Sequence, residues 1–323
     1  MTLKAEVLGV LEKNRSRVLS GQELANELNV SRTAIWKVIH SLKEEGFNIH
    51  SVSNKGYQLD TSCDLLSVPG IQAYLRKEYE KNELVVHSLV DSTNEEAKKL
   101  MLSGAKHGTI ILAEEQSSGK GRFGRVFYSP PHTGIYMSLI LRPKLNLQSA
   151  VLLTTAVSVA VCRAIEEVCQ QSVQIKWVND IYLNEKKIGG ILTEAVTDFE
   201  SGTVESVIIG IGLNVSTIDF PEELQSIATS LKPTQGTRNQ LAASVINHVL
   251  SICENLESEI FMDEYKSRST VLEKEIYYFR NGIRFEGRAL DFNEEGALIV
   301  QTHENEVVTL NSGEITIRLI ETE

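Results

Sequence analysis

The sequence predicts a multidomain α+β protein, because its pattern of apolar residues changes character twice along the chain. The first 64 of the 323 residues have the spacing of short helices followed by a β-hairpin. Residues 65–270 mix strands with helices, and strands joined by short turns favour a mixed sheet over a purely parallel one. From residue 271, short strands alternate with turn signals, which is typical of a small β-barrel. We therefore expect three domains, over 1–64, 65–270 and 271–323.

The first domain carries the local signals of a helix-turn-helix unit with a wing. Helices are expected over 3–11, 21–28 and 31–46. Ser20 and Ser31 are the expected N-caps of the second and third helices. An apolar stripe in the third helix faces the core, and alternating residues around Asn54-Lys55-Gly56 predict the hairpin. The polar side of the third helix is left with Arg32, Thr33, Trp36 and Lys37.

The other two domains are predicted from periodicity and turn residues. Strands are expected over 84–90, 109–115, 134–142, 174–184, 186–196 and 205–215, and helices over 94–103, 149–169 and 238–266. Turns of the third domain are expected at Asn281-Gly282, 293–296, Glu304-Asn305 and Ser312-Gly313. A module of about 50 residues buries little core by itself, so we expect it to pack on the second domain.

Composition and charge exclude several classes of protein. The chain is 42% hydrophobic and 23% charged, and no stretch reaches the roughly 18 consecutive apolar residues that a membrane span needs. Its start lacks the features of a secretion signal, so we expect a cytoplasmic protein without membrane contacts. Four scattered cysteines without a C-x-x-C pair predict reduced, mostly buried thiols and no metal site. Residues 1–60 carry a net charge of +1 within a total of −11, so only this part is suited to approach nucleic acid.

The strongest chemical signal is a basic, glycine-rich loop over 117–125 that directly follows a predicted strand. Three glycines let its backbone bend closely around a ligand, and Lys120, Arg122 and Arg125 suit a phosphate or carboxylate. A dinucleotide fold would need a helix to begin here, which Pro130-Pro131 prevents, and the other kinase motifs and the P-loop G-K-[ST] are absent from the sequence. The alternative is a solvated turn.

Two lysines of one expected hairpin, Lys176 and Lys187, could present an ammonium to an anion beside Gly189-Gly190, although both could be ordinary exposed strand lysines. The residues from Asp91 to Asn94 end a strand and begin a helix, so capping alone could explain Ser92 or Thr93.

A third polar stretch lies near the end of the last strand predicted in the second domain. There Gly210 and Gly212 precede Asn214, whose amide could pair with an adenine-like edge. Glycines in a strand also mark bulges.

Together these motifs resemble the biotin protein ligases, and specifically the bifunctional bacterial type that is also the biotin operon repressor. The matching residues are Asp91–Asn94, Gln116, Gly119–Arg125, Met137-Ser138, Leu141–Pro143, Lys176-Trp177, Asn179-Asp180, Lys187, Gly190–Leu192, Glu194, Gly210 and Gly212–Asn214. The resemblance implies a winged helix, a mixed-sheet ligase domain related to class II aminoacyl-tRNA synthetases, and an SH3-like barrel. Two residues depart from the family pattern: Lys120 stands where the family has arginine, and Val178 stands where it has proline. Lysine keeps the charge but loses the bidentate geometry of arginine. A loop that closes less tightly for this reason would release the intermediate faster.

The resemblance also implies a two-step, ATP-dependent reaction. Biotin and MgATP give biotinyl-5′-adenylate and pyrophosphate, and a lysine of the biotin carboxyl carrier protein of acetyl-CoA carboxylase then attacks the activated acyl carbon. A carboxylate is a poor electrophile because attack adds charge to an anion, and a mixed anhydride removes that obstacle. Preorganised cations would stabilise the charge that develops at the α-phosphate. No nucleophilic side chain is needed.

Residue roles follow from the same resemblance. The biotin site would consist of Ser92, Thr93, Asn94, Gln116, Lys120, Gly121, Arg122 and Lys187. The adenylate site would consist of Gly119, Arg125, Phe127 and Asn214. The catalytic residues would be Lys187, Arg122, Arg125 and Asp180, with Asp180 orienting either the incoming lysine or the metal. The residues that bind operator DNA would be Ser31, Arg32, Thr33, Trp36, Lys37 and Lys55. The DNA-binding form would be a homodimer that the bound adenylate promotes.

Three alternatives remain open: a transcription factor that only senses a small molecule, a lipoate ligase of related fold, and a ligase whose winged helix is vestigial. Pyrophosphate release, the choice of acid and the shift of operator DNA distinguish them.

Overall fold

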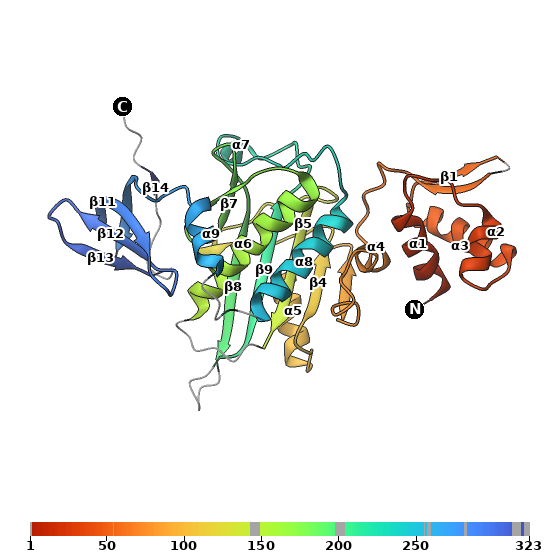
Figure 1. Ribbon diagram of the computed structural model, residues 1–323, viewed down its shortest axis with the longest axis horizontal. Helices are drawn as coiled ribbons and strands as arrows, with labels where there is room; N and C mark the ends of the chain where they lie inside the picture. The colour runs from red at the N-terminus through yellow and green to blue at the C-terminus, as the bar shows by residue number, and fades with distance from the viewer. Residues whose placement is uncertain are drawn as a thin grey trace.

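The computed structural model describes residues 2–53, 55–142, 149–197, 204–254, 256, 260–280, 283–311 and 318–319. A helical N-terminal module lies at one end of the molecule and a small β-sheet at the other, with a large sheet and its helices between them (Figure 1). Among the described helices, none combines the length and apolar character that crossing a bilayer demands.

The N-terminal module has the predicted helix-turn-helix with a hairpin. Its elements are α1 (Leu3–Lys13), α2 (Gly21–Glu27), α3 (Arg32–Glu44), β1 (Ile49–Val52) and β2 (Gly56–Leu59), and the two strands pair antiparallel. Ser20 and Glu23 form a capping box at α2, and the Ser31 hydroxyl accepts a hydrogen bond from Ala34 N (3.1 Å) at α3. The expected caps and the apolar stripe of α3 are therefore confirmed, while Asn54 of the expected turn lies outside the described residues.

The central sheet is mixed, as predicted. Its seven described strands run in the order β3 (Leu84–His87), β4 (Thr109–Ala113), β5 (Gly134–Leu141), β9 (Val204–Asn214), β8 (Lys186–Thr197), β7 (Asp180–Leu183) and β6 (Gln174–Lys176). Only the β3–β4 pair is parallel among these described strands. Alternation divides the faces: Ile110 and Leu112 join the main core, whereas Ile111 packs against Ala97.

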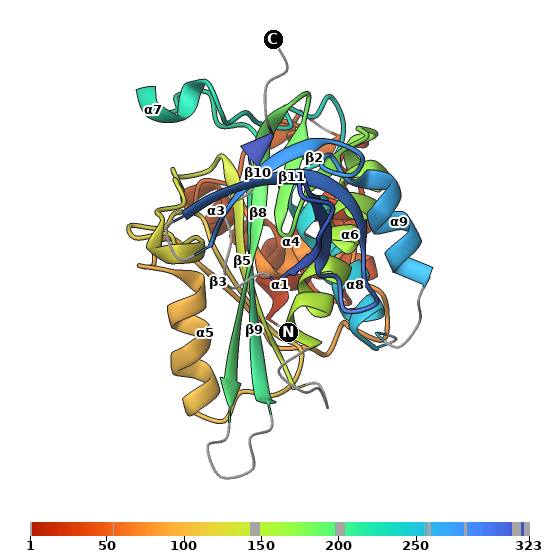
Figure 2. The same cartoon turned by 90° about the vertical axis from the view of Figure 1, so that its left-hand side faces the viewer.

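Helices cover the two faces of this sheet unequally. On one face lie α6 (Ser149–Cys169) and α8 (Arg238–Glu254), and on the other lies α5 (Thr93–Leu102), as Figure 2 shows. Because α5 covers only part of its face, side chains at the ends of β5, β8 and β9 remain available for a site.

Two predictions of elements were wrong. The expected strand 174–184 is two strands, β6 and β7, with a turn between them, so β7 separates Lys176 from Lys187. The expected helix 238–266 is α8 followed by α9 (Ile260–Arg268), which packs the Tyr265 ring against Phe292 of the C-terminal sheet at 5.0 Å between centroids. The short helices α4 (Val68–Gln72) and α7 (Glu222–Gln225) are too brief to leave a periodic signal.

The C-terminal module is an antiparallel sheet that packs on the central one. Its five described strands run in the order β13 (Val307–Leu310), β12 (Leu298–Thr302), β11 (Ile283–Phe292), β10 (Glu275–Arg280) and β14 (Arg318–Leu319). Turns occur as expected at 293–296 and Glu304-Asn305, whereas Asn281-Gly282 and Ser312-Gly313 lie outside the described residues. The predicted packing is confirmed, because Trp177 Nε1 donates to Gly296 O (2.9 Å) and both sheets share one apolar core.

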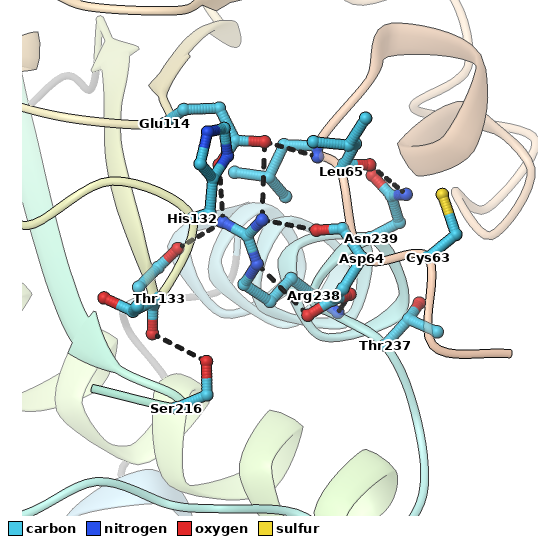
Figure 3. A network of polar contacts seen from close by, with 12 residues as sticks. Cys63, Asp64, Leu65, Glu114, His132, Thr133, Ser216, Thr237, Arg238 and Asn239 are labelled. Carbon is cyan, nitrogen blue, oxygen red and sulfur yellow. Dashed lines mark hydrogen bonds and ion pairs between the residues drawn. The ribbon is translucent and has the colours of Figure 1, made fainter. Parts of the chain in front are cut away.

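A buried arginine anchors the segment that leads from the N-terminal module into the central sheet (Figure 3). Arg238, 1% exposed, bonds Glu114 Oε2 (2.7 Å), Gly134 O (3.0 Å) and Asp64, through both the carboxylate and the carbonyl oxygen of Asp64. Arg15, two residues after the end of α1, holds the same segment from the other side through the carbonyl oxygens of Asp60 and Cys63 (3.0 and 2.7 Å). Hydrogen bonds from both the N-terminal module and the central domain therefore hold this connecting segment.

Candidate active site

The floor of the candidate site is a patch of central sheet without side chains. Gly190, Gly210 and Gly212 belong to the paired strands β8 and β9 and lie on the face that α5 partly covers. A Cβ on Gly210 would lie 2.3 Å from Asn94 Oδ1, and one on Gly212 would lie 2.7 Å from the Phe127 ring. Close approach, rather than a bulge, therefore explains these two glycines.

The first wall is the start of α5. Ser92 is the N-cap residue of α5 and is 2% exposed, but its side chain makes no capping hydrogen bond in the described structure, so capping does not account for its hydroxyl. Thr93 N and Oγ1 donate to Gln116 Oε1 (2.8 and 3.2 Å), and Ser138 Oγ donates to Asn94 Oδ1 (2.6 Å). Ser92, Thr93, Asn94 and Gln116 are thus brought together, and buried hydroxyls and amides hold them in fixed orientations.

The glycine-rich loop, residues 117–125, forms the roof. It contains a 3-10 turn over Arg122–Gly124, with Gly121 N donating to Arg125 O (2.7 Å) and Phe127 N to Gly119 O (2.9 Å). No α-helix begins within this fully described loop, which confirms the exclusion of a dinucleotide fold. Within the loop, Arg125 remains exposed.

The loop reaches both sides of the floor through its cations. Lys120 Nζ lies 2.7 Å from Glu95 Oε1 on α5, and Arg122 Nη1 donates to Asn179 Oδ1 (3.0 Å) in the β6–β7 turn. A turn that is surrounded by solvent would lack these contacts, so they argue against the alternative of a solvated turn.

Lys187 lies at the floor beside Gly190, where a Cβ on the glycine would be 3.4 Å from the lysine Nζ. Its Nζ lies 2.6 Å from Asp180 Oδ1, and its backbone pairs with Ile227 O and Thr229 N (2.9 Å each). Burial lowers the pKa of Arg122 below its usual value, and the nearby Asp180 carboxylate opposes that shift. The three charged groups of Lys187, Asp180 and Arg122 therefore share one neighbourhood. Lys176, by contrast, lies over the Tyr182 ring, with its Nζ 5.5 Å from the ring centroid.

An apolar shelf with one unpaired acceptor lies at the far end of the floor. The Phe127 ring packs over Gly212 and meets the Tyr136 ring edge-on at 6.4 Å between centroids. Asn214, 5% exposed, donates to Thr229 O (3.3 Å), while its Oδ1 is buried without a partner among the described residues. A flat ring with an amino group would satisfy both features.

The sequence reasoning missed an ion network beneath the loop. Lys98 Nζ lies 2.9 Å from Glu95 Oε1 and 2.8 Å from Glu194 Oε1, and Glu194 Oε2 accepts from Asn94 Nδ2 (2.7 Å). The i,i+3 spacing of Glu95 and Lys98 was a usable helix signal. Their contacts to Lys120 and Glu194 depend on the tertiary fold.

A separate polar face lies on the N-terminal module. Ser31, Arg32, Thr33, Trp36 and Lys37 are exposed on or before α3, and Lys55 is exposed in the β1–β2 turn. The Trp36 side chain is 57% exposed and stacks on His40 at 5.7 Å between ring centroids. This face therefore presents an aromatic ring together with the positive charges of Arg32 and Lys37.

Comparisons with known proteins match the two parts of the chain that carry these residues. Residues 86–214 match the Biotin/lipoate A/B protein ligase family, and residues 4–58 match an HTH domain family. The chain is 36% identical over 312 residues to the bifunctional ligase/repressor BirA of Bacillus subtilis, covering 94% of this chain and 95% of that protein. It is 27% identical over 317 residues to BirA of Escherichia coli, covering 94% of each chain. The biotin protein ligase of Aquifex aeolicus in complex with biotin and ATP superposes with a TM-score of 0.65 and 29% identity over 74% of this chain and 100% of that one.

Proposed function

Because the chain belongs to the BirA family of bifunctional ligase/repressors, we propose that it attaches biotin to a carrier-protein lysine with ATP and represses biotin genes. The observation that carries the ligase half is the convergence of Lys187, Asp180 and the glycine-rich loop over a floor of glycines. A protein that only senses a small molecule has no need for these cations around one anion site.

In the first step, we assign the α5 wall to biotin and the apolar shelf to adenosine. Ser92, Thr93, Asn94 and Gln116 offer hydroxyl and amide groups to the ureido ring, and Asn214 Oδ1 accepts from the adenine amino group. Lys187 holds the biotin carboxylate and then the α-phosphate, with Arg122 and Arg125 neutralising the charge that develops there. Gly119 and Gly121 let the loop backbone approach the ligand. Asp180, 2.6 Å from Lys187, keeps the ammonium aimed at the reacting atoms.

In the second step, the carrier lysine attacks the acyl carbon of the adenylate and AMP leaves. The loop excludes water until the carrier arrives, since the mixed anhydride would otherwise hydrolyse.

Magnesium enters with ATP in this proposal. The described residues include no group of three His, Cys, Asp or Glu side chains that could hold a metal. Mg²⁺ typically binds one or two carboxylates together with substrate phosphates and water, which fits a site where Asp180 offers a carboxylate beside Lys187. The metal supplies charge neutralisation at the phosphates.

The N-terminal module supplies the repressor half. Arg32, Thr33, Trp36 and Lys37 of α3 enter the major groove, Ser31 begins the helix, and Lys55 of the wing lies near phosphate. Its weak net charge favours binding as an adenylate-loaded homodimer on a palindrome.

We further propose domain boundaries at 64 and 270, an SH3-like barrel for the C-terminal sheet and a class II synthetase-like central sheet. The five short antiparallel strands and the mixed seven-stranded order support the last two assignments. The reaction with a carrier protein and the repression of genes place the protein in the cytoplasm.

The ligase half is tested by mass spectrometry of a carrier domain after incubation with ATP and either biotin or lipoate. Addition of one biotin per acceptor lysine is expected. Transfer of lipoate in preference to biotin would establish the related ligase, and absence of both transfer and pyrophosphate release would leave a sensor.

The repressor half is tested by the shift of the protein's own biotin-operon DNA. Adenylate-loaded protein should shift it, and Trp36→Ala should weaken that shift at least about tenfold without changing ligation, because base-edge and backbone contacts are lost together. A ligated protein that shifts no operator DNA would make the winged helix vestigial.

A further inference from the structure

We propose that Glu95 is a positioning residue that holds the glycine-rich loop over the biotin site through Lys120. The inference rests on the proposed ligase function and extends it to a residue outside the family motif. It concerns the loop before substrate binds.

Glu95 lies on α5, directly after the wall residues Thr93 and Asn94, and its carboxylate contacts the loop. Its Oε1 lies 2.7 Å from Lys120 Nζ and 2.9 Å from Lys98 Nζ. Lys98 also contacts Glu194, which accepts a hydrogen bond from Asn94. One continuous network therefore joins the loop to Asn94 of the α5 wall.

Lys120 and Arg122 fasten the loop at two opposite points. Lys120 bonds α5, and Arg122 bonds Asn179 in the β6–β7 turn. The loop thus spans the floor with one contact on each side. Loss of either the Lys120 or the Arg122 contact leaves the other in place. Hydrogen bonds from Lys120 and then from Lys98 lower the pKa of Glu95 to about 2, so its carboxylate stays ionised at neutral pH.

The contact between Glu95 and Lys120 involves the lysine that stands where the family has arginine. The ammonium of Lys120 is a compact charge that a single carboxylate oxygen can hold, whereas an arginine there would present a planar fork. A loop already held in place loses less conformational freedom when biotin binds, so its binding-competent fraction is larger. Glu95 therefore compensates for the lysine.

The test compares Glu95→Gln with Glu96→Gln, a matched control on the same turn of α5. Glu96 contacts Lys99 (2.6 Å) rather than the loop. The Glu95 and Lys120 side chains are 34% and 48% exposed, and such a pair contributes a factor of roughly two to five. Glu95→Gln should raise the KM for biotin and speed adenylate release by about that factor, leaving kcat for pyrophosphate exchange nearly unchanged. Glu96→Gln should change neither.

Two further measurements separate positioning from a general structural role. Trypsin cleavage after Arg122 and Arg125 in ligand-free protein, followed by mass spectrometry, should be about two to five times faster in Glu95→Gln than in wild type, and unchanged in Glu96→Gln. In a double-mutant cycle, Glu95→Gln should add nothing to Lys120→Gln, because the carboxylate acts through that lysine.

Equal cleavage rates in Glu95→Gln and Glu96→Gln, or fully additive effects in the cycle, would overturn the proposal. The cleavage assay needs no activity, so it tests the loop attachment even if wild-type protein transfers no biotin. Absence of transfer in wild type would instead count against the proposed function.

Discussion

Replacing Arg238 with methionine should strongly destabilise the central domain. The side chain is 1% exposed and its guanidinium bonds both Glu114, whose side chain is 8% exposed, and Asp64. Methionine fills similar space but leaves the buried Glu114 carboxylate without its cation. Removing one partner of a buried ion pair costs about 3–5 kcal/mol. The equivalent loss at Arg17, which pairs with Glu23 at 58% and 54% side-chain exposure, should stay below about 1 kcal/mol.

The assay is urea unfolding followed by tryptophan fluorescence. The chain has two tryptophans, so a Trp36→Phe background leaves Trp177 of the central domain as the only reporter. With a slope of about 3 kcal/mol per molar urea, Arg238→Met should lower the midpoint by at least roughly 1 M. A midpoint shift below about 0.3 M, which corresponds to the 1 kcal/mol of an exposed pair at this slope, would refute the reasoning that this network anchors the connection.

Two further predictions concern the adenosine shelf and the thiols. Gly212→Ala should raise the KM for ATP at least about tenfold, since the new methyl displaces the Phe127 ring, and steady-state kinetics at saturating biotin would show it; an unchanged KM for ATP would remove Phe127 from the shelf. Burial raises the pKa of Cys162 to about 12 and that of Cys169 to about 11, so at pH 8 almost no thiolate is present and iodoacetamide should leave both unmodified until the protein unfolds. Rapid alkylation of either in native protein would contradict their burial.

Features with local causes were predictable from the sequence. Ser20 and Ser31 cap their helices because the capping bond spans only three residues. The glycine-rich loop was recognised because its glycines and cations are contiguous. The predicted free thiols are confirmed, since all four cysteines are free.

Features with tertiary causes were not predictable from the sequence. The turn after Lys176 interrupts what reads as one apolar strand, and only the antiparallel pairing of Lys176 with Asp180 reveals two. The contact between Asn94 and Glu194 joins residues 100 positions apart, beyond any helical or strand period. Ser92 has the position of a cap without the side-chain hydrogen bond, a difference that the local sequence does not reveal.

The central claim is that the ammonium of Lys187 and the glycine-rich loop act on one acyl phosphate. The neighbouring Lys186 offers a control, since its Nζ instead donates to Gln225 O (2.9 Å). The decisive measurement is biotin-dependent exchange of pyrophosphate into ATP by wild type, Lys187→Ala and Lys186→Ala. We predict a loss of about 10²-fold or more for Lys187→Ala, as for removal of a preorganised transition-state contact, and near wild-type exchange for Lys186→Ala. Equal exchange by the two variants would contradict the claim.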